Sequence, residues 1–504
     1  NTLRKNIPVS FARIPPILQE RVLDWFYGLF IGLIQRYLWA KFTQEPAMTN
    51  AAALNAIEPL LQKRLNRSAA DRDLHGRSES HFPPMPPDAV AYVESTEEVQ
   101  QVMRICAQHG CPVIGWGTGT SLEGHTSAPR GGLAVDFSRM GQVLQINPDD
   151  MNGVVQPGLT REALNLELRH SGLFFSVDPG ADASIGGMAA TRASGTTTLR
   201  YGTMRDNVLG LQVVLADGRV IRTGTRARKS AAGYDLTALF VGSEGTLGLI
   251  TEISLRLHPR PEAISAGIVA FERMDQAVRA VVDTIQLSLP MARLEFVDAA
   301  TAAAFNLYAG ADMAEKPHLL FELHGSDQSV AEHARSFGEI CTAEGGEAFQ
   351  WSSQTEERQA LWTLRHNAYY AILATRPGAR AIVTDICVPI SRLAEAVEDT
   401  LADIAASPIT GPILGHVGDG NFHAILLIDA DNAAERSAAL RLSDQMVDRA
   451  LRLGGTATGE HGVGMGKLKF MDQEHGPAWG LMGDLKRQLD PLNILNPGKL
   501  VQQN

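Results

Sequence analysis

The sequence predicts an α+β protein with at least two domains, and three observations support this class. The chain has 504 residues, which is too long for one ordinary hydrophobic core. Up to about residue 258, short apolar runs alternate with glycine-rich turns. From about residue 263, amphipathic helices alternate with apolar strands, an order that suggests an antiparallel sheet with helices packed on it.

Composition indicates a globular protein that does not bind nucleic acid. Apolar residues make up 44% of the chain and charged residues 20%, a balance that excludes extended disorder. The formal net charge of −11 disfavours contact with a polyanionic backbone. The four cysteines form no Cys-x-x-Cys pair, so they predict neither a disulfide framework nor a zinc cluster, and they fit a reducing compartment.

The N-terminal part divides into two segments. Within residues 1–47, the stretch 22–34 is strongly apolar, but its thirteen residues are fewer than the ~20 that span a bilayer. The favoured interpretation is upstream DNA translated in frame, because Met48 opens a more ordinary sequence. The alternative is a helix on a membrane surface. Residues 48–83 begin with helical spacing and end in a proline cluster that indicates entry into the next domain.

Short strands dominate the expected elements between residues 84 and 262. Residues 96–109 are the exception, with helical periodicity opened by a Ser95 or Thr96 cap. The turn at residues 216–218, Ala-Asp-Gly, predicts a hairpin between two apolar runs. Strands are expected at residues 89–93, 112–115, 132–137, 154–157, 211–215 and 220–223.

Residues 263–450 are expected to form the second domain, followed by a C-terminal segment, 451–504. Glycines become sparse, and the helices are longer. Strands are expected at residues 264–269, 292–297, 319–323, 382–388 and 413–428. Helices are expected at residues 274–289, 329–344 and 433–453.

Two histidines flank a predicted hairpin turn within that domain. Asp419-Gly420 favours a type I′ turn, which needs positive φ at both central residues. Folding about this turn would pair His416 with His423 directly, with Cβ atoms roughly 4.5–5.5 Å apart. Two imidazoles at that spacing can chelate one metal ion, and a later Gly-Glu-His-Gly at 459–462 could add a carboxylate and a free histidine. Two histidines that only hydrogen-bond within a strand pair are the alternative.

Three loops rich in glycine and hydroxyl residues lie at 115–124, 178–203 and 242–248. Consecutive N–H groups in such loops can form an anion-binding nest. The first loop is not a Rossmann fingerprint, since Leu122 stands where the third glycine belongs, and no Gly-Lys-Ser/Thr follows for a P-loop. Three such loops in one domain indicate a long, phosphate-bearing ligand such as a dinucleotide, whereas a single one is often only a tight turn.

Together these motifs resemble a known group of flavoproteins over roughly residues 60–502. The loops at 112–124, 179–202 and 241–250 resemble the FAD-binding domain of the vanillyl-alcohol oxidase/PCMH superfamily. The later motifs are similar to its D-2-hydroxyacid dehydrogenase branch, and most similar to FAD-dependent D-lactate dehydrogenases. The residues that carry this similarity are 361–370, 384–391, 416–423, 459–462 and 496–499.

The resemblance implies an α+β fold with a PCMH-type FAD-binding domain at 84–262, an antiparallel-sheet cap domain at 263–450, and a C-terminal segment that returns to the FAD. It implies noncovalent FAD, because the first loop has Thr118 and Thr120 where some superfamily members carry a flavin-linked histidine. The implied FAD-binding residues are Gly117, Thr118, Gly119, Thr120, Ser121, Gly180, Ser184, Gly186, Gly187, Ala190, Ser194, Gly195, Thr196, Gly245, Ile250 and Asn496.

The same resemblance implies the chemistry of the second half. His461 would be the general base, because an imidazole titrates near neutral pH. Arg365 would bind the substrate carboxylate, for which a guanidinium is well shaped, with Asn367 and Tyr369 as weaker pocket candidates. A divalent ion, Zn²⁺ or Mn²⁺, would be held by His416, His423 and Glu460.

The expected reaction is oxidation of a small D-2-hydroxyacid such as D-lactate, with a quinone or cytochrome as acceptor. Relatives that act on 2-hydroxyglutarate carry a lysine in the strand where this chain has Val383 and Thr384, which favours a short monocarboxylate. Arg376 and Arg380 would weaken that inference if they fold inward. The alternatives are a larger D-hydroxyacid, a flavin transferase similar to alkyl-glycerone-phosphate synthases, and a metal-dependent hydrolase. A cytoplasmic location is expected, with possible peripheral contact on the inner face of the membrane.

Overall fold

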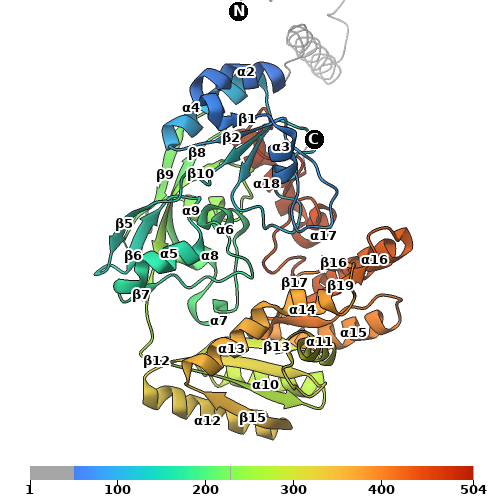
Figure 1. The fold of residues 1–504 in the computed structure, drawn as a ribbon. Coiled ribbons are helices and arrows are strands. Elements are labelled where there is room, and N and C mark those ends of the chain that lie inside the picture. Colours follow the sequence, from blue (N-terminus) through green and yellow to red (C-terminus); the bar gives the residue numbers. More distant parts are fainter. Residues whose placement is uncertain (1–49, 228, 503–504) are drawn as a thin grey trace, which may run out of the picture.

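The computed structural model describes residues 50–227 and 229–502, so the expected extension at 1–47 lies outside the described residues. Figure 1 shows an upper domain, built mainly from the first half of the chain, and a lower domain built from the yellow and orange segments. The C-terminal segment, in red, returns to the upper domain. Within the described ranges, no helix is both long and apolar enough to cross a membrane.

The upper domain contains a four-stranded sheet in the order β1-β2-β4-β3. Strands β2, β4 and β3 run parallel, and β1 is antiparallel to β2. Helix α4 has the predicted bounds, because Ser95 caps its first turn and Gly110 ends it in a left-handed conformation. The elements are α2 (Asn50–Leu61), β1 (Leu65–Asn66), α3 (Ala69–His75), β2 (Ala89–Tyr92), α4 (Thr96–His109), β3 (Val113–Trp116) and β4 (Leu133–Asp136).

A second sheet in the upper domain is antiparallel, in the order β5-β6-β10-β8-β9. The predicted hairpin at 216–218 is confirmed, since Val214 pairs with Val220. Its strands are β5 (Val143–Asn147), β6 (Asn152–Val155), β8 (Val208–Val214), β9 (Val220–Gly224) and β10 (Leu249–Arg256). Around it lie α5 (Arg161–Glu167), β7 (Leu173–Phe174), α6 (Ile185–Thr191), α7 (Thr198–Tyr201), α8 (Met204–Asn207), α9 (Leu236–Phe240) and β11 (His258–Pro259).

The lower domain is a single sheet in the order β15-β12-β14-β13-β18-β19-β16, with β17 also paired to β19, and its ladders are antiparallel. This confirms the predicted antiparallel α+β domain. Its strands are β12 (Ala263–Phe271), β13 (Met291–Val297), β14 (His318–Gly325), β15 (Gly346–Ser352), β16 (Arg380–Val383), β17 (Ile386–Cys387), β18 (Ile413–His416) and β19 (Asn421–Ile428).

Helices cover both faces of this sheet, and each face has its own core. One core includes residues of α10 (Met274–Gln286), α12 (Asp327–Ala343), α15 (Leu393–Ala405) and α16 (Ala433–Arg452). The other includes residues of α11 (Ala299–Ala309), α13 (Thr355–His366) and α14 (Ala368–Ala374). These three helices cover only part of the second face. The uncovered part faces the upper domain and carries His416 and His423.

The strand expected at 382–388 is interrupted, and the interruption matters for the site. The backbone N–H of Thr384 still donates to the carbonyl of Ala424 (3.0 Å), but the N–H of Ala424 donates to the side-chain hydroxyl of Thr384 (2.8 Å), so the regular ladder ends here. Two short strands, β16 and β17, result from this break. Asp385 is thereby placed between them with its side chain fully buried.

The C-terminal tail extends the first sheet beyond β3. The N–H of Val113 donates to the carbonyl of Ile494 (2.7 Å), and the N–H of Asn496 donates back to the carbonyl of Val113 (2.8 Å). Leu495, fully buried, belongs to the core of this sheet. Helices α17 (Met471–His475) and α18 (Pro477–Leu489) precede the tail, so the predicted return of the C-terminus to the FAD domain is confirmed.

Replacing Leu495 with alanine should lower the free energy of unfolding by about 2–5 kcal/mol, because it leaves a cavity where the tail meets the sheet. Leu492→Ala is the matched control, since its side chain is 56% exposed and should change stability by no more than about 0.5 kcal/mol. Denaturant unfolding of both variants tests this, and equal midpoints would contradict the docking role of the tail.

Candidate active site

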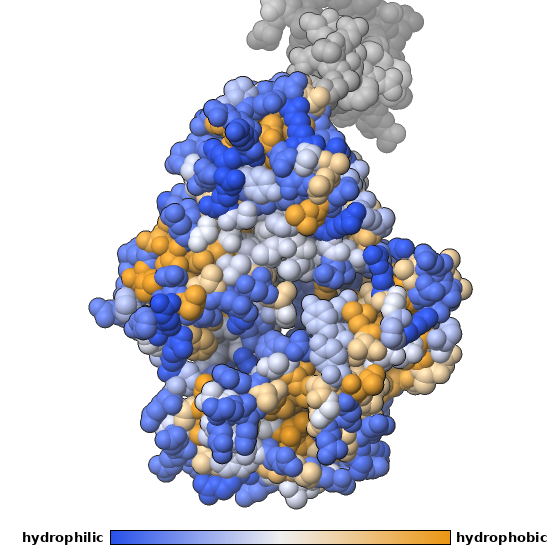
Figure 2. All heavy atoms as spheres, viewed as in Figure 1, coloured by the Kyte–Doolittle hydropathy of each residue, from blue (hydrophilic) through white to orange (hydrophobic). Residues whose placement is uncertain are grey.

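A cavity of about 500 Å³ lies where the glycine-rich loops of the upper domain face the lower sheet. The surface is hollowed where the two domains meet (Figure 2). Residues of all three loops, of α13 and α14, and of β18, β19 and the C-terminal segment line it. The sequence regions predicted for cofactor, substrate and metal therefore share one cavity.

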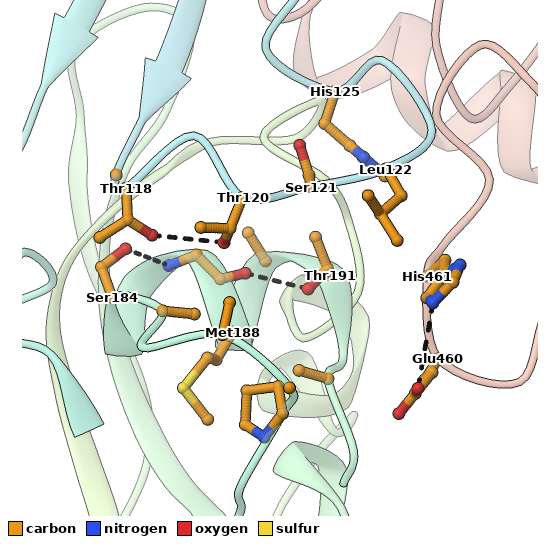
Figure 3. A pocket seen from close by; sticks show the side chains of 18 of the residues that line it. Thr118, Thr120, Ser121, Leu122, His125, Ser184, Met188, Thr191, Glu460 and His461 are labelled. Atoms are coloured by element: carbon orange, nitrogen blue, oxygen red, sulfur yellow. Dashed lines mark hydrogen bonds and ion pairs between the residues drawn. The ribbon is translucent and has the colours of Figure 1, made fainter. Parts of the chain in front are cut away.

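The first loop packs on the start of α6, as Figure 3 shows. A Cβ at Gly117 would lie 2.1 Å from Ser184 Oγ, so a larger residue would displace the hydroxyl that caps α6. Gly180 differs, because a Cβ there meets no atom of the described residues within 4 Å. The hydroxyl of Ser121 is buried in the cavity wall without a hydrogen-bond partner from the described chain. The free space at the Gly180 backbone and the unpaired hydroxyl of Ser121 fit a bound phosphate group.

Most residues predicted to bind FAD line this cavity. Gly195 does not belong to the lining that the described residues form, since a Cβ there would lie 2.3 Å from the carbonyl oxygen of Asp178. Gly195 packs against the start of its own loop. The predicted residues that line the cavity are Gly117, Thr118, Gly119, Thr120, Ser121, Gly180, Ser184, Gly186, Gly187, Ala190, Ser194, Thr196, Gly245, Ile250 and Asn496.

The predicted hairpin exists, but the predicted register of its two strands is wrong. His423 pairs with Leu414, and His416 pairs with Asn421. Residues Val417–Asp419 form a short 3-10 turn that ends at Gly420, which alone has positive φ, so the type I′ turn does not form. The two histidines are diagonal neighbours on one face of the sheet, with ring centroids 5.6 Å apart. The two histidines are therefore close together, as predicted, although the strands pair in a different register.

Glu460 completes a cluster with the two histidines. Its Oε1 lies 3.2 Å from His423 Nε2 and 3.4 Å from His416 Nε2. The hydroxyl of Ser194, from the upper domain, donates to the other carboxylate oxygen at 2.8 Å. Burial opposes ionisation, but His416 and His423 outweigh it and hold the pKa of Glu460 well below its usual value.

The ring nitrogens of the cluster are oriented as metal ligands usually are. His423 Nδ1 lies 2.9 Å from the carbonyl of Thr384, and His416 Nδ1 lies 2.7 Å from Glu295 Oε1. Both partners only accept, so each Nδ1 carries a proton and, in the neutral ring, each Nε2 offers a lone pair. Together with a Glu460 oxygen, the two Nε2 atoms make three donor atoms that lie within 4.8 Å of one another. This set fits Zn²⁺ or Mn²⁺.

Negative charge surrounds His416 on both sides. Burial alone would lower the pKa of His416, but Glu295 and Glu460 raise it well above its ordinary value. The two carboxylates thus require positive charge between them. A proton on His416 or a divalent ion on the cluster can supply it.

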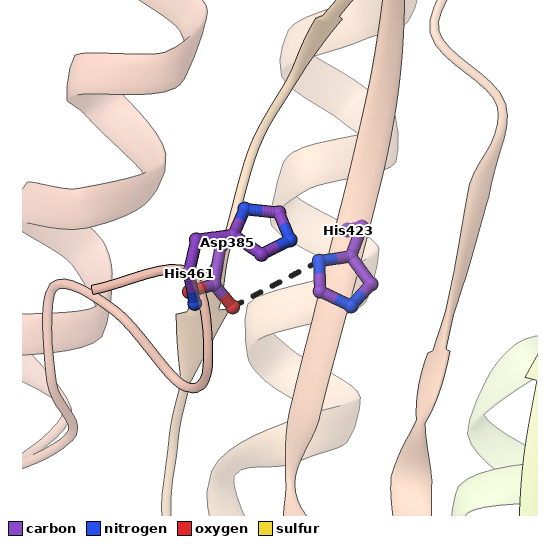
Figure 4. Close-up of side chains that lie close together, drawn as sticks. All are labelled: Asp385, His423 and His461. Atoms are coloured by element: carbon purple, nitrogen blue, oxygen red, sulfur yellow. Dashed lines mark hydrogen bonds and ion pairs between the residues drawn. The ribbon is translucent and has the colours of Figure 1, made fainter. Parts of the chain in front are cut away.

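Hydrogen bonds to Asp385 allow Glu460 and His461, which are adjacent in sequence, both to reach the cavity. Its Oδ2 accepts hydrogen bonds from the backbone N–H groups of Glu460 (3.0 Å) and His461 (2.9 Å) and from the hydroxyl of Thr458 (2.6 Å). Its Oδ1 accepts from the side-chain amide of Asn421 (2.8 Å). These bonds bend the loop around the carboxylate. Asp385 also lies near His423 and His461 (Figure 4), but its oxygens are occupied, so it organises the loop.

His461 lies beside the cluster of His416, His423 and Glu460 but does not hydrogen-bond to it. Its ring stacks on His423 at a centroid distance of 5.1 Å, and its Nε2 lies 4.0 Å from Glu460 Oε1. Its Nδ1 is buried without a hydrogen-bond partner among the described residues. Burial lowers the pKa of His461, so the ring is neutral near pH 7 and can accept a proton.

Arg365 enters the same cavity from α13. Its Nη2 donates to Glu295 Oε2 at 2.6 Å, and its Nε is buried with no partner in the described chain. Unused donor capacity fits the predicted contact with a carboxylate. Tyr369 lines the cavity, whereas Asn367, at the junction of α13 and α14, is not part of the lining.

Sequence reasoning did not single out Glu295 or Asp385. Glu295 is fully buried on β13, and Asp385 is fully buried between β16 and β17. A signal was present in each case, since a lone carboxylate within a predicted apolar strand demands a partner when buried. The partners could not be read from sequence, because His416 lies 121 positions from Glu295.

The fold and the cavity together define a two-domain flavin-dependent oxidoreductase, and the comparisons agree. Residues 87–224 match the model of the family described as FAD binding domain, and residues 260–500 match that described as FAD linked oxidases, C-terminal domain. The chain belongs to the FAD-linked oxidase family. The resemblance noted in the sequence is thereby confirmed.

Two curated relatives illustrate the similarity. The chain is 47% identical to "Probable D-lactate dehydrogenase, mitochondrial" of Danio rerio over 438 residues, which cover 86% of this chain and 88% of that protein. It is 40% identical to "D-lactate dehydrogenase (cytochrome), mitochondrial" of Arabidopsis thaliana, covering 89% and 80%. Both names state a mitochondrial location, so the expectation of a cytoplasmic location is wrong.

A solved structure of p-cresol methylhydroxylase with substrate bound has the same fold. It superposes with a TM-score of 0.75 at 18% identity and covers 89% of this chain and 96% of that one. At this identity the similarity concerns the fold alone. It confirms the predicted PCMH-type architecture.

Replacing Asp385 with asparagine should release the loop, because an amide has one oxygen acceptor and cannot receive the donors that now share two. Amide hydrogen exchange at Glu460 and His461 should accelerate by at least tenfold. Thr458→Val removes one donor and leaves the carboxylate, so it should have a smaller effect. Unchanged exchange in Asp385→Asn would show that the loop does not depend on this residue.

Proposed function

We propose that this protein oxidises D-lactate, or a D-2-hydroxyacid of similar size, to the 2-oxoacid with FAD as the immediate electron acceptor. The observation that carries the proposal is the shared cavity, in which Arg365, His461 and the cluster of His416, His423 and Glu460 face the FAD-binding loops. The names of the two curated relatives support the substrate.

The residues that would hold the two cofactors are separate. The first loop and the start of α6 would hold the pyrophosphate of FAD, noncovalently, and the cluster would hold Zn²⁺ or Mn²⁺. When bound, FAD supplies the two-electron acceptor, and the divalent ion supplies Lewis-acid activation of the substrate hydroxyl.

The chain's own residues orient the substrate and move its proton. Arg365 binds the carboxylate through the donors that Glu295 leaves free, which sets the direction of the C2–H bond. His461 accepts the hydroxyl proton at Nε2, the ring nitrogen nearest Glu460. The hydrogen and electron pair on C2 leave toward the flavin side of the cavity, and the C2–O bond becomes a carbonyl.

Cavity walls favour a short, apolar substrate side chain. Val383, Leu414 and Ile425 line the cavity from β16, β18 and β19. Arg376 lies elsewhere, because both its Nη atoms bond to Glu435 (2.9 and 3.1 Å). Arg380 is exposed and is not part of the described lining. A second carboxylate, as in 2-hydroxyglutarate, would lack a cationic partner at these walls.

A cytochrome-type acceptor fits the name of the Arabidopsis relative, and a quinone is the alternative. Contact with a membrane surface stays a prediction.

An anaerobic absorbance spectrum of the purified protein tests the proposal. The oxidised flavin band near 450 nm (a general property of flavins) should bleach with D-lactate, and it should persist with L-lactate and with D-2-hydroxyglutarate at the same concentration. Bleaching by D-2-hydroxyglutarate alone would move the substrate to the larger class. A band that no hydroxyacid bleaches would contradict the dehydrogenase proposal and favour a non-redox use of flavin.

Replacing His461 with glutamine should reduce kcat for D-lactate by about 10²–10⁴-fold while the flavin stays bound, because no group would then accept the hydroxyl proton. His318→Gln is the matched control, since that histidine is also buried but lies on β14 outside the cavity lining. Stopped-flow bleaching measures both variants. Full activity in His461→Gln would assign the base elsewhere.

A further inference from the structure

Glu295 joins the two parts of the site that the proposed function uses. It lies on β13, where the antiparallel pairing of Phe296 with Gly415 places it beside His416. One oxygen accepts from Arg365 Nη2 at 2.6 Å, and the other lies 2.7 Å from His416 Nδ1. The residue is fully buried, so both oxygens are used within the protein.

We propose that Glu295 is the positioning residue of the site, which simultaneously aims Arg365 at the substrate carboxylate and sets His416 as a metal ligand through Nε2. This proposal rests on the proposed function and extends it to a residue that touches neither substrate nor cofactor. Its basis is the pair of contacts that one carboxylate makes to two different elements, α13 and β18.

The two contacts constrain each other through hydrogen-bond chemistry. Arg365 can only donate, so it requires an acceptor at Glu295 Oε2. A carboxylate is an acceptor on both oxygens, so the proton of His416 sits on Nδ1 and the lone pair sits on Nε2. Ligands held in this way gain affinity for the metal, and loss of such a partner typically costs 10–100-fold in affinity.

Replacing Glu295 with glutamine separates these functions with almost no change of shape. If the amide oxygen faces Arg365, the amide NH₂ faces His416 Nδ1 and donates to it. The ring must then carry its proton on Nε2, which cannot bind a metal. If the amide turns over, its NH₂ meets the guanidinium donors of Arg365 and displaces them. Either orientation breaks one half of the site.

A suitable control lies three residues away. Asp298 is also a buried carboxylate near the end of β13, but it accepts from the N–H of Thr301 (2.7 Å) and caps α11. It does not belong to the described cavity lining. Asp298→Asn removes the same charge as Glu295→Gln and keeps a residue type that caps helices well.

The experiment measures Zn²⁺ and Mn²⁺ affinity of FAD-loaded, metal-depleted enzyme by competition with a chromophoric chelator. Asp298→Asn should match wild type in both metal affinity and KM. Glu295→Gln should bind the ions at least tenfold more weakly if its amide NH₂ faces His416, or raise the KM for D-lactate at saturating metal at least tenfold if that NH₂ faces Arg365. Flavin content and melting temperature report the fold of each variant.

Glu295→Asp serves if the glutamine variant does not fold, because it keeps the charge but is one methylene too short to reach both partners. It should weaken metal binding, raise KM, or do both. Wild-type affinity and KM in a folded variant would overturn the role of Glu295 and leave the proposed function standing. A wild-type protein that binds neither ion would overturn both this role and the metal assignment.

Discussion

Asp385 accepts hydrogen bonds from the backbone of two consecutive residues, Glu460 and His461, and the rest of the site depends on this interaction. Neighbouring residues in an extended chain project to opposite sides. The bend around the carboxylate lets one side chain join the histidine cluster while the next stacks beside it. Without the bend, the proposed metal ligand and the proposed base could not share a cavity.

The same loop is held from the other side by the upper domain. Glu244 accepts from the backbone N–H groups of Val463 (2.7 Å) and Gly464 (2.8 Å), and Ser194 donates to Glu460. The loop that carries the proposed base is therefore bonded to one buried carboxylate from each domain. The free-energy cost of removing these carboxylates from water is offset by charge-assisted hydrogen bonds from the backbone. These bonds hold the loop between the FAD-binding loops and the proposed metal-binding cluster.

Glu295 has a comparable role on the sheet. It contacts Arg365 and His416, which come from different elements, so the proposed substrate-binding cation and a proposed metal ligand are positioned together. Groups held by buried partners before substrate arrives need no rearrangement during the reaction. The antiparallel sheet of the lower domain supplies His416, His423 and Glu295 from one face, whereas Arg365 comes from α13 and Glu460 and His461 come from the C-terminal segment.

Sequence by itself determined the local features and the chemical groups. Helix α4 has its predicted bounds because a capping serine, an apolar period and a terminal glycine all lie within its own residues. The glycine-rich loops and the Gly-Glu-His-Gly motif were recognisable because each is contiguous. Tertiary structure decided the register that sets His423 opposite Leu414 and the roles of Glu295 and Asp385. The roles of Glu295 and Asp385 depend on contacts across 36 to 121 positions, which packing selects and local sequence does not encode.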